Sequence, residues 1–265
     1  MTERTLTSET TGPVTIDAHL TSGGPVTVRA DAGCDRATLT IRTVDEQGPA
    51  ADAVRNATLR QSGTTRRAGV RDVGGGTTIV SGGITQIASG NHGATIVQCA
   101  GTVYGSMTGV TILNGQVAGG GPATVVQGSS PIEIIAVVPE GSSLEACTVS
   151  AGIDTHGPLA NISAETTSGR IHLDRTDVAT CQTVSGRIMI DDFGGTARLE
   201  TVSGRVTVYA TAGGDLRITT VSGRIDVTAS DAATADDLNV QTSSVSGRIN
   251  VPPQRVPGRV RRRRG

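Results

Sequence analysis

The amino-acid sequence predicts an all-β protein, a right-handed β-solenoid or β-helix-like stack of coils about 18 residues long, with an N-terminal strand-rich cap region. Three observations predict this class. Aromatic residues make up only 1% of the chain, so the core must consist of small aliphatic side chains, which suits a thin interior of stacked layers. The 36 glycines and the abundant Thr and Ser indicate many short strands joined by tight turns. A short motif also recurs at a nearly constant spacing.

The recurring motif is Ser-Gly-Arg followed by Ile or Val. It begins at Ser168, Ser185, Ser203, Ser222 and Ser246, and a degenerate copy begins at Ser150, so successive spacings are 18, 17, 18, 19 and 24 residues. Repeats this short cannot enclose a core alone and must stack on their neighbours. The fixed spacing and the identical corners favour a solenoid over a β-sandwich of the same strands, whose loops are usually irregular.

Each copy predicts a strand, a Ser-Gly corner, a second strand and a turn. Around Gly204, Leu199 and Thr201 alternate with outward residues before the corner, and Val206 and Val208 resume the alternation after it. Glycine suits the corner because it bends without a Cβ clash. The predicted corner glycines are Gly169, Gly186, Gly204, Gly223 and Gly247. Stacked copies would form an inner threonine ladder (Thr166, Thr183, Thr201, Thr220) beside an aliphatic ladder (Ile171, Ile188, Val206, Ile225, Ile249).

The distribution of charge divides the chain into four regions. Residues 1–72 form a strand-rich region with nine Arg and nine acidic residues, and residues 73–132 form a Gly- and Thr-rich β insert without any charge. Residues 133–254 hold the Ser-Gly-Arg repeats, with fifteen acidic residues against eight Arg. Residues 255–265 form an Arg-rich tail that we expect to be disordered, because it combines Pro, Gly and like charges.

The repeats resemble a known family. Together with the hydrophobic segment 132–144, which contains Pro139-Glu-Gly141, they resemble the bacterial putative-adhesin β-strand-repeat family of unknown function, built of T-x-S-G-x-[IV] units. The resemblance is strong over residues 130–251 and weaker over residues 12–60. It implies a strand-rich solenoid and a role in surface attachment, and it implies no known ligand or active site.

The uncharged insert has two interpretations. Its Ser81-Gly-Gly-Ile84 segment echoes the Ser-Gly corner, which favours further coils of the same solenoid with a neutral outer face. Alternatively, its high β propensity and lack of charge describe a self-association surface, with residues 96–101 faintly similar to amyloid-signalling cores.

The arginines that follow the corners, Arg170, Arg187, Arg205, Arg224 and Arg248, are expected to form one outward stripe about 5 Å apart. The interpretation we favour from the sequence pairs them with Glu165, Glu200, Asp174, Asp191 and Asp226. The alternative is a binding site for a polyanion, to which the tail residues Arg261, Arg262, Arg263 and Arg264 could add. The tail could equally contact anionic lipid or the acidic body of another subunit, or only aid solubility.

No motif for catalysis, a metal or a cofactor is present. The four His and four Cys lack ligand spacing, Asp191 and Asp192 are adjacent and do not form a hydrolytic pair, and the single cysteines are expected to be buried thiols. The N-terminus has no export signal, no stretch suits a membrane span, and a cytoplasmic location is expected. The sequence thus predicts a non-enzymatic scaffold that self-associates into homo-oligomers or filaments; the alternative is an adhesin-like module that binds a polyanion or surface glycan.

Overall fold

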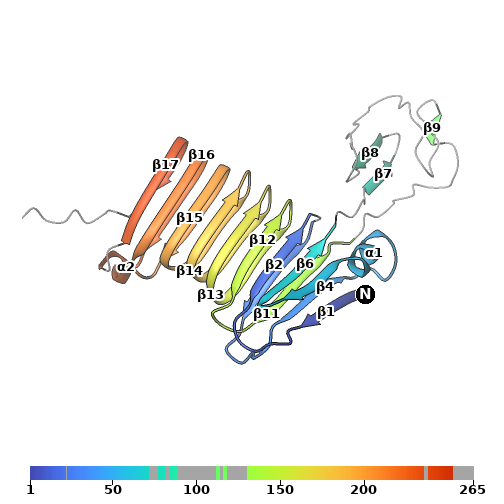
Figure 1. The fold of residues 1–265 in the computed structure, drawn as a ribbon. Coiled ribbons are helices and arrows are strands. Elements are labelled where there is room, and N and C mark those ends of the chain that lie inside the picture. Colours follow the sequence, from blue (N-terminus) through green and yellow to red (C-terminus); the bar gives the residue numbers. More distant parts are fainter. Residues whose placement is uncertain are drawn as a thin grey trace, which may run out of the picture.

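The computed structural model describes residues 1–21, 23–71, 77–81, 84–88, 112–113, 116–117, 130–235 and 238–252. Its strands lie side by side in one elongated stack, with the N-terminus and helix α1 (Pro49–Arg55) at one end and the last strand at the other (Figure 1). Thirteen strands belong to one sheet. The all-β class predicted from the sequence is confirmed.

Residues 1–72 contribute six strands to this sheet. They are β1 (Thr2–Thr7), β2 (Thr15–Leu20), β3 (Pro25–Ala30), β4 (Thr38–Thr43), β5 (Thr58–Ser62) and β6 (Thr65–Val70). The later part of the chain contributes β11 (Glu133–Val138), β12 (Ser143–Thr148), β13 (Gly152–Thr166), β14 (Arg170–Thr183), β15 (Arg187–Ala210), β16 (Gly214–Ala229) and β17 (Leu238–Asn250). Strand β11 lies between β3 and β4, and β12 lies between β2 and β13, so the first 72 residues are continuous with the repeats.

The sheet folds over at β13 to give two faces. Residues before the Ser-Gly corners form the first face, in the order β5, β6, β2, β12 and then the repeats, and residues after the corners form the second face, in the order β1, β4, β11, β3 and then the repeats. Neighbouring strands from β2 and β3 onward are parallel, as successive coils of a solenoid require, whereas β1, β4 and β5 pair antiparallel to their neighbours.

Alternate residues of both faces point inward and make the core. The first face buries residues such as Leu199 and Ile218, and the second face buries Ile171, Ile188 and Ile225, all 0% exposed. The threonine ladder predicted from the sequence is confirmed, since Thr166, Thr183, Thr201 and Thr220 are all buried. The aliphatic ladder holds as far as Ile225. Ile249 is 40% exposed, because no described strand follows β17 in the sheet, and its predicted burial is wrong.

Four short strands are described within the uncharged insert. Strand β7 (Thr77–Ser81) pairs antiparallel with β8 (Ile84–Ala88), and β9 (Ile112–Leu113) pairs antiparallel with β10 (Gln116–Val117). Both pairs are separate from the thirteen-stranded sheet, so these strands are not the further parallel coils that the sequence favoured. The segment 96–101, proposed above for self-association, lies outside the described residues.

Candidate functional site

The Ser-Gly-Arg corners stack directly over one another. Ser203, Gly204 and Arg205 of β15 lie in register with the equivalent triplet of β16, and that triplet lies in register with the one in β17. At the other end of the series, Arg170 of β14 lies opposite Arg187 of β15. The repeat spacing therefore produces continuous columns of like residues along one rim of the stack.

Close approach between coils explains the corner glycines. A Cβ on Gly204 would lie 2.2 Å from the carbonyl oxygen of Gly186, and a Cβ on Gly186 would lie 2.0 Å from that of Gly169. No corner glycine has the left-handed φ that favours glycine. The corner therefore excludes a side chain because the neighbouring backbone occupies its space, and not because the chain must bend there, as the sequence analysis assumed.

The inward threonines support the first corners. Thr166 Oγ1 accepts a hydrogen bond from the Gly169 N–H at 3.0 Å, and Thr183 Oγ1 accepts one from the Gly186 N–H at the same distance. These bonds satisfy buried polar groups and hold the corner in place. They give the Thr-x-Ser-Gly spacing a structural reason.

The stacked triplets line a shallow open groove with a volume of about 620 Å³. Serine, glycine and arginine residues of the stacked corners line it. The groove extends over the four triplets that begin at Ser168, Ser185, Ser203 and Ser222. Such an arrangement presents hydroxyl groups and guanidinium groups together along one line.

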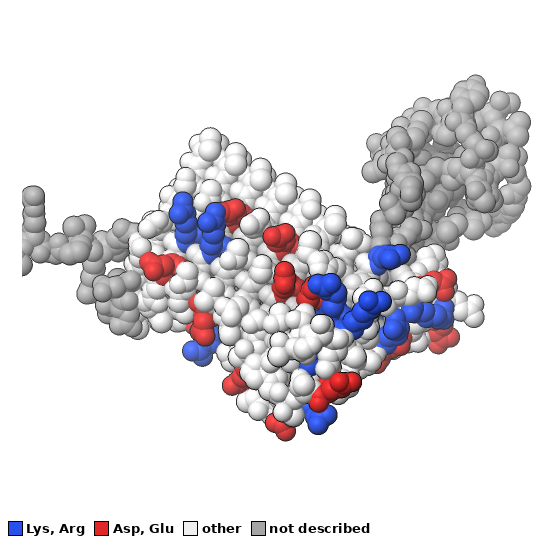
Figure 2. Space-filling view, in the orientation of Figure 1, with Lys and Arg blue, Asp and Glu red and all other residues white. Residues whose placement is uncertain are grey.

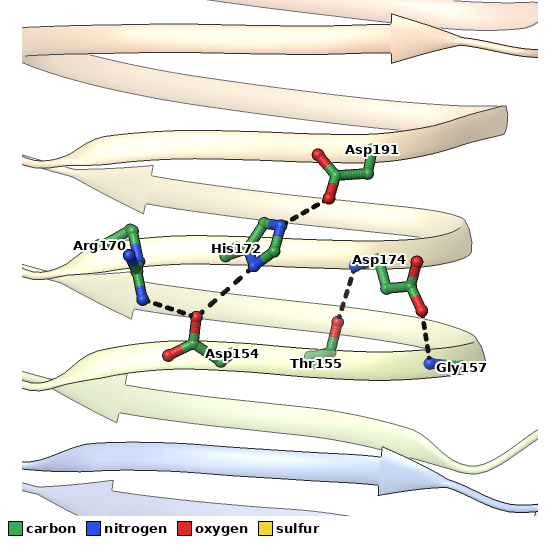
Figure 3. A network of polar contacts seen from close by, with 7 residues as sticks. All are labelled: Asp154, Thr155, Gly157, Arg170, His172, Asp174 and Asp191. Atoms are coloured by element: carbon green, nitrogen blue, oxygen red, sulfur yellow. Dashed lines mark hydrogen bonds and ion pairs between the residues drawn. The ribbon is translucent and has the colours of Figure 1, made fainter.

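Arg170, at one end of the arginine column, belongs to a network of polar contacts (Figure 3). Its Nη2 lies 3.1 Å from Asp154 Oδ1. His172 lies between two carboxylates on neighbouring strands: its Nδ1 is 3.6 Å from Asp154 Oδ1 and its Nε2 is 2.7 Å from Asp191 Oδ2. Asp174 accepts a hydrogen bond from the Gly157 N–H at 2.8 Å. The acidic residues near this end therefore already have partners.

The four arginines further along the column differ from Arg170. Arg187, Arg205, Arg224 and Arg248 are exposed, and within the described part of the chain their side chains make no ion pair or hydrogen bond. The pairing with acidic residues favoured by the sequence analysis is therefore wrong for these four. Glu200 instead pairs with Arg198 at 2.7 Å, Asp191 contacts His172, and Asp174 binds Gly157.

The remaining expected partners are also unused. Neither Glu165 nor Asp226 forms an ion pair with a described residue. Glu165 and Glu200 lie before their corners on the first face, whereas the arginines follow the corners on the second face. The corner therefore separates these carboxylates from the arginine column. For this reason the excess of acidic residues in the repeat region does not produce ion pairs with the corner arginines.

A column of exposed valines runs beside the serines and was missed in the sequence analysis. Val184, Val202 and Val221 are each 47 to 49% exposed, and together with Glu165 and Gln182 they line a second groove of about 430 Å³. The signal was present, because Val occupies the variable position of T-x-S-G in most copies. In the view of Figure 2 the long upper rim of the stack carries only uncharged residues, and charged side chains lie on the face below it, over the N-terminal and the C-terminal strands alike.

The three described cysteines have different environments, and Cys99 lies outside the described residues. Cys181 is buried in the core, and burial raises the pKa of its thiol to about 12, which fits the structural role expected for it. Cys34 is partly exposed and Cys147 is exposed, so the expected burial is wrong for them. Desolvation, assisted by the nearby charge of Glu165, raises the pKa of the Cys147 thiol. The pKa of the Cys147 and Cys181 thiols is therefore raised, whereas a reactive cysteine needs a lowered one.

The remaining sites considered from the sequence are the arginine tail, a metal site and a membrane span. Arg261, Arg262, Arg263 and Arg264 lie outside the described residues. Among the residues that the structure does describe, no cluster of three His, Cys, Asp or Glu side chains could hold a metal ion. No described helix is long and apolar enough to cross a membrane.

The fold and the groove define a stacked all-β repeat protein with a basic rim. The sequence pattern of the family Toastrack DUF4097 matches residues 86–262, and the chain belongs to this family. The match includes much of the uncharged insert as well as the repeats. A comparison with curated proteins finds no match.

Three solved structures are similar over almost their whole length. A "putative adhesin" from Bacteroides fragilis is 12% identical with a TM-score of 0.43, and the alignment covers 94% of this chain and 97% of that one. A "putative lipid binding protein" from Parabacteroides distasonis is 14% identical with a TM-score of 0.38, covering 95% and 97%. A "putative cell adhesion protein" from Clostridium sporogenes is 7% identical with a TM-score of 0.32, covering 94% and 97%.

Proposed function

We propose that this protein is a non-enzymatic binding module for a linear acidic polysaccharide, which it holds along the Ser-Gly-Arg groove. The observation that supports the proposal is the row of exposed arginines without carboxylate partners, Arg187 to Arg248, on stacked corners. The scaffold beneath it is proposed to be the right-handed solenoid, with coils of about 18 residues, that the repeat spacing predicts.

The electrostatics of the row favour an extended anion. Adjacent strands lie about 4.8 Å apart, and like charges directly opposite each other at that distance repel. Because no described carboxylate neutralises Arg187, Arg205 or Arg224, a polymer with regularly spaced anionic groups would relieve this repulsion along several coils at once. Each contact would release a counterion from the polymer, and binding would weaken as salt is added.

The composition of the groove favours a sugar polymer over a nucleic acid. Only Ser, Gly and Arg line it, so it has no aromatic ring on which a base could stack. Serine hydroxyls can donate and accept hydrogen bonds and therefore suit the hydroxyl groups of a sugar. Guanidinium groups bind carboxylate and sulfate oxygens in the same way as they bind phosphate.

The test measures retention of the full-length protein on immobilised heparin, a sulfated polysaccharide, across a salt gradient. We expect salt-sensitive retention that the double variant Arg205→Ser/Arg224→Ser reduces, with the slope of log K against log salt falling by about 0.7 for each arginine removed. Competition with hyaluronan, polyphosphate, oligo(dT) and neutral dextran identifies the chemistry that is preferred. We expect the acidic polysaccharides to compete best and dextran not to compete.

The matched control is Arg198→Ser/Arg217→Ser. These two arginines lie in register on the same two strands, β15 and β16, but before the corner and outside the groove. The control removes the same charge from the same coils and should leave most of the retention intact. Equal losses in both double variants, retention that disappears only when residues 255–265 are deleted, or preferential competition by oligo(dT) would each overturn the proposal.

A further inference from the structure

Arg66 occupies a core position at which an arginine is not expected. It lies on β6, in register with the buried Ile16 of β2. Its side chain points inward, as do those of Ala68 and Val70 on the same strand, and it is only 1% exposed. Arginine is almost never fully buried unless an anion pairs with it, because removing a charge from water is costly. An anionic partner is therefore expected for Arg66.

The described residues give Arg66 only neutral partners. Its Nη1 donates to the carbonyl oxygens of Gly63 and Thr65 at 2.6 and 3.2 Å. Its Nη2 donates to Ser8 Oγ and Thr10 Oγ1 at 2.6 and 2.8 Å. Within the described part of the chain no ion pair includes Arg66, and its Nε–H has no hydrogen-bond partner. The positive charge is thus buried without a counter-charge.

The unpartnered donor belongs to the edge of the guanidinium group that reaches the loop between β1 and β2. Nε and Nη2 form one edge of this planar group, and the N–H groups of such an edge can bind two oxygens of one carboxylate or phosphate side by side. Nη2 already reaches Thr10 Oγ1, and the Nε–H beside it is unused. This edge therefore has the donors that a phosphate attached to Thr10 requires.

Thr10 is also the contacting hydroxyl residue that an enzyme can reach. It is exposed, in the segment without regular structure between β1 and β2. Ser8 is only 1% exposed, and its hydroxyl donates to the Thr10 carbonyl oxygen at 2.6 Å. Thr11 is exposed, but no hydrogen bond joins it to Arg66 among the described residues. Glu9, the acidic residue of this loop, forms no ion pair with Arg66, so the place of an anion is not taken.

We propose that Thr10 is a phosphorylation site and that its phosphate pairs with the buried Arg66. A protein kinase transfers the γ-phosphoryl group of ATP. The bond between Thr10 Oγ1 and phosphorus forms, the bond from phosphorus to the β,γ-bridging oxygen breaks, ADP leaves, and the hydroxyl proton passes to a base of the kinase. Phosphothreonine carries about −1.5 to −2 charges at pH 7 and accepts hydrogen bonds on three oxygens. It supplies the counter-charge that Arg66 lacks and ties the β1–β2 loop to β6.

The first test measures the Tm of full-length protein that carries phosphothreonine at position 10, introduced by genetic code expansion. The matched control carries it at position 11, one residue further along the same exposed loop. We expect phosphorylation of Thr10 to raise the Tm by about 3 °C, because additional charge-assisted hydrogen bonds in a chain of this size correspond to a few degrees. Phosphorylation of Thr11 should change it by about 1 °C or less. Equal gains at both positions, or a loss at Thr10, would overturn the proposal.

Phosphorus NMR adds a measurement that does not depend on stability. A guanidinium group beside the phosphate favours the dianion, so the second ionisation should occur about one pH unit lower at Thr10 than at Thr11. Arg66→Gln should abolish this difference. If that variant does not fold, the comparison of the two positions in the otherwise unchanged protein still decides. Identical titrations at the two positions would rule out pairing with Arg66.

Phosphopeptide mapping of the protein from its native cells tests the modification itself, which we expect on Thr10. An unmodified Thr10, or phosphate only at Ser8 or Thr11, would overturn it. Inorganic phosphate is a second source of the same anion, and we expect it to leave the Tm of the unmodified protein as it is in chloride of equal ionic strength. Stabilisation by inorganic phosphate that Arg66→Gln removes would mean that the site takes a free anion, which also contradicts the proposal. These measurements contain no polysaccharide and concern residues outside the Ser-Gly-Arg groove, so their outcome is independent of the proposed function.

Discussion

The closed N-terminal end and the open C-terminal end of the stack are built from the same kind of strand but differ in what surrounds them. At the N-terminal end the chain turns antiparallel, adds helix α1, and buries Arg66, whose guanidinium group binds Ser8 Oγ at 2.6 Å and Thr10 Oγ1 at 2.8 Å. At the C-terminal end β17 is the last described strand of the sheet, and β16 is its one partner among the described strands. A repeat unit therefore does not carry its own stability, since the same residue type is buried or exposed according to whether a further layer covers it.

The comparison extends to the polar corners. In the earlier coils Thr166 and Thr183 accept hydrogen bonds from corner glycines. In the later coils the buried hydroxyl oxygens of Thr201, Thr220 and Ser244 have no hydrogen-bond partner among the described residues. The arginine column follows the same trend: Arg170 is paired, and Arg187 to Arg248 of the column have no partner among the residues that the structure describes. Buried polar atoms without a hydrogen-bond partner also occur in the N-terminal strands, at Asp17 Oδ1 and Arg66 Nε, so the contrast holds for the repeat corners and not for the whole stack.

The largest expected difference concerns the aliphatic ladder. Ile225→Ala should lower the free energy of unfolding by about 3.5 kcal/mol, because the side chain is fully buried and leaves a cavity. Ile249→Ala, at the residue opposite it in register, should cost less than about 1 kcal/mol in dilute protein, because the side chain is already partly in water. Urea denaturation monitored by circular dichroism measures both. Similar losses for the two variants would show that the C-terminal end is covered.

A smaller difference is expected for the corner glycines. Gly204→Ala places a methyl group against the backbone of the coil below and has further coils above it, so we expect a loss of about 3 kcal/mol. Gly247→Ala meets an equally close carbonyl oxygen, that of Gly223 at 2.0 Å, but β17 has no second partner among the described strands and can shift outward. Its loss should be clearly smaller. Urea denaturation monitored by circular dichroism measures both losses. Equal denaturation midpoints for the two variants would contradict the expectation that β17 can shift outward.

The smallest effect is a pH dependence at the closed end. Hydrogen bonds from the Ser130 hydroxyl and backbone N–H lower the pKa of Asp45 below its ordinary value of 3.8. A lowered pKa in the folded state means that this carboxylate stabilises the fold above its unfolded pKa and loses that effect as the pH falls through the folded pKa. Thermal unfolding of Asp45→Ala should therefore show a slightly lower Tm than wild type at pH 7 and the same Tm near pH 2.

The control for this measurement is Asp35→Ala, which removes an exposed carboxylate that forms no ion pair with a described residue. We expect no difference from wild type at either pH. If Asp45→Ala lowers the Tm equally at both pH values, packing around Asp45, and not its ionised carboxylate, stabilises this part of the fold.

Much of the architecture could be predicted from the repeats. Identical corners at nearly constant spacing predicted the stacked register, the buried threonines and the row of arginines, because equivalent residues of a solenoid must coincide when strands pair in parallel. The exposed valine column could have been found in the same way, from the variable position of T-x-S-G. The partners of each arginine could not be predicted from the sequence. Whether Asp191 contacts His172 or an arginine depends on differences of a few ångströms between side chains on neighbouring coils.

The sequence by itself determined the fold class, the position of the corners and which residues face inward, because strand alternation and repeat spacing are local properties of the chain. Only the tertiary structure decided that four arginines of the corner column lack partners among the described residues, that the N-terminal strands turn antiparallel at one end, and that β17 is the last described strand of the sheet. These features depend on contacts between segments far apart in the chain, such as β3 with β11 or β1 with β4, and a periodic pattern carries no information about where such a stack begins or ends.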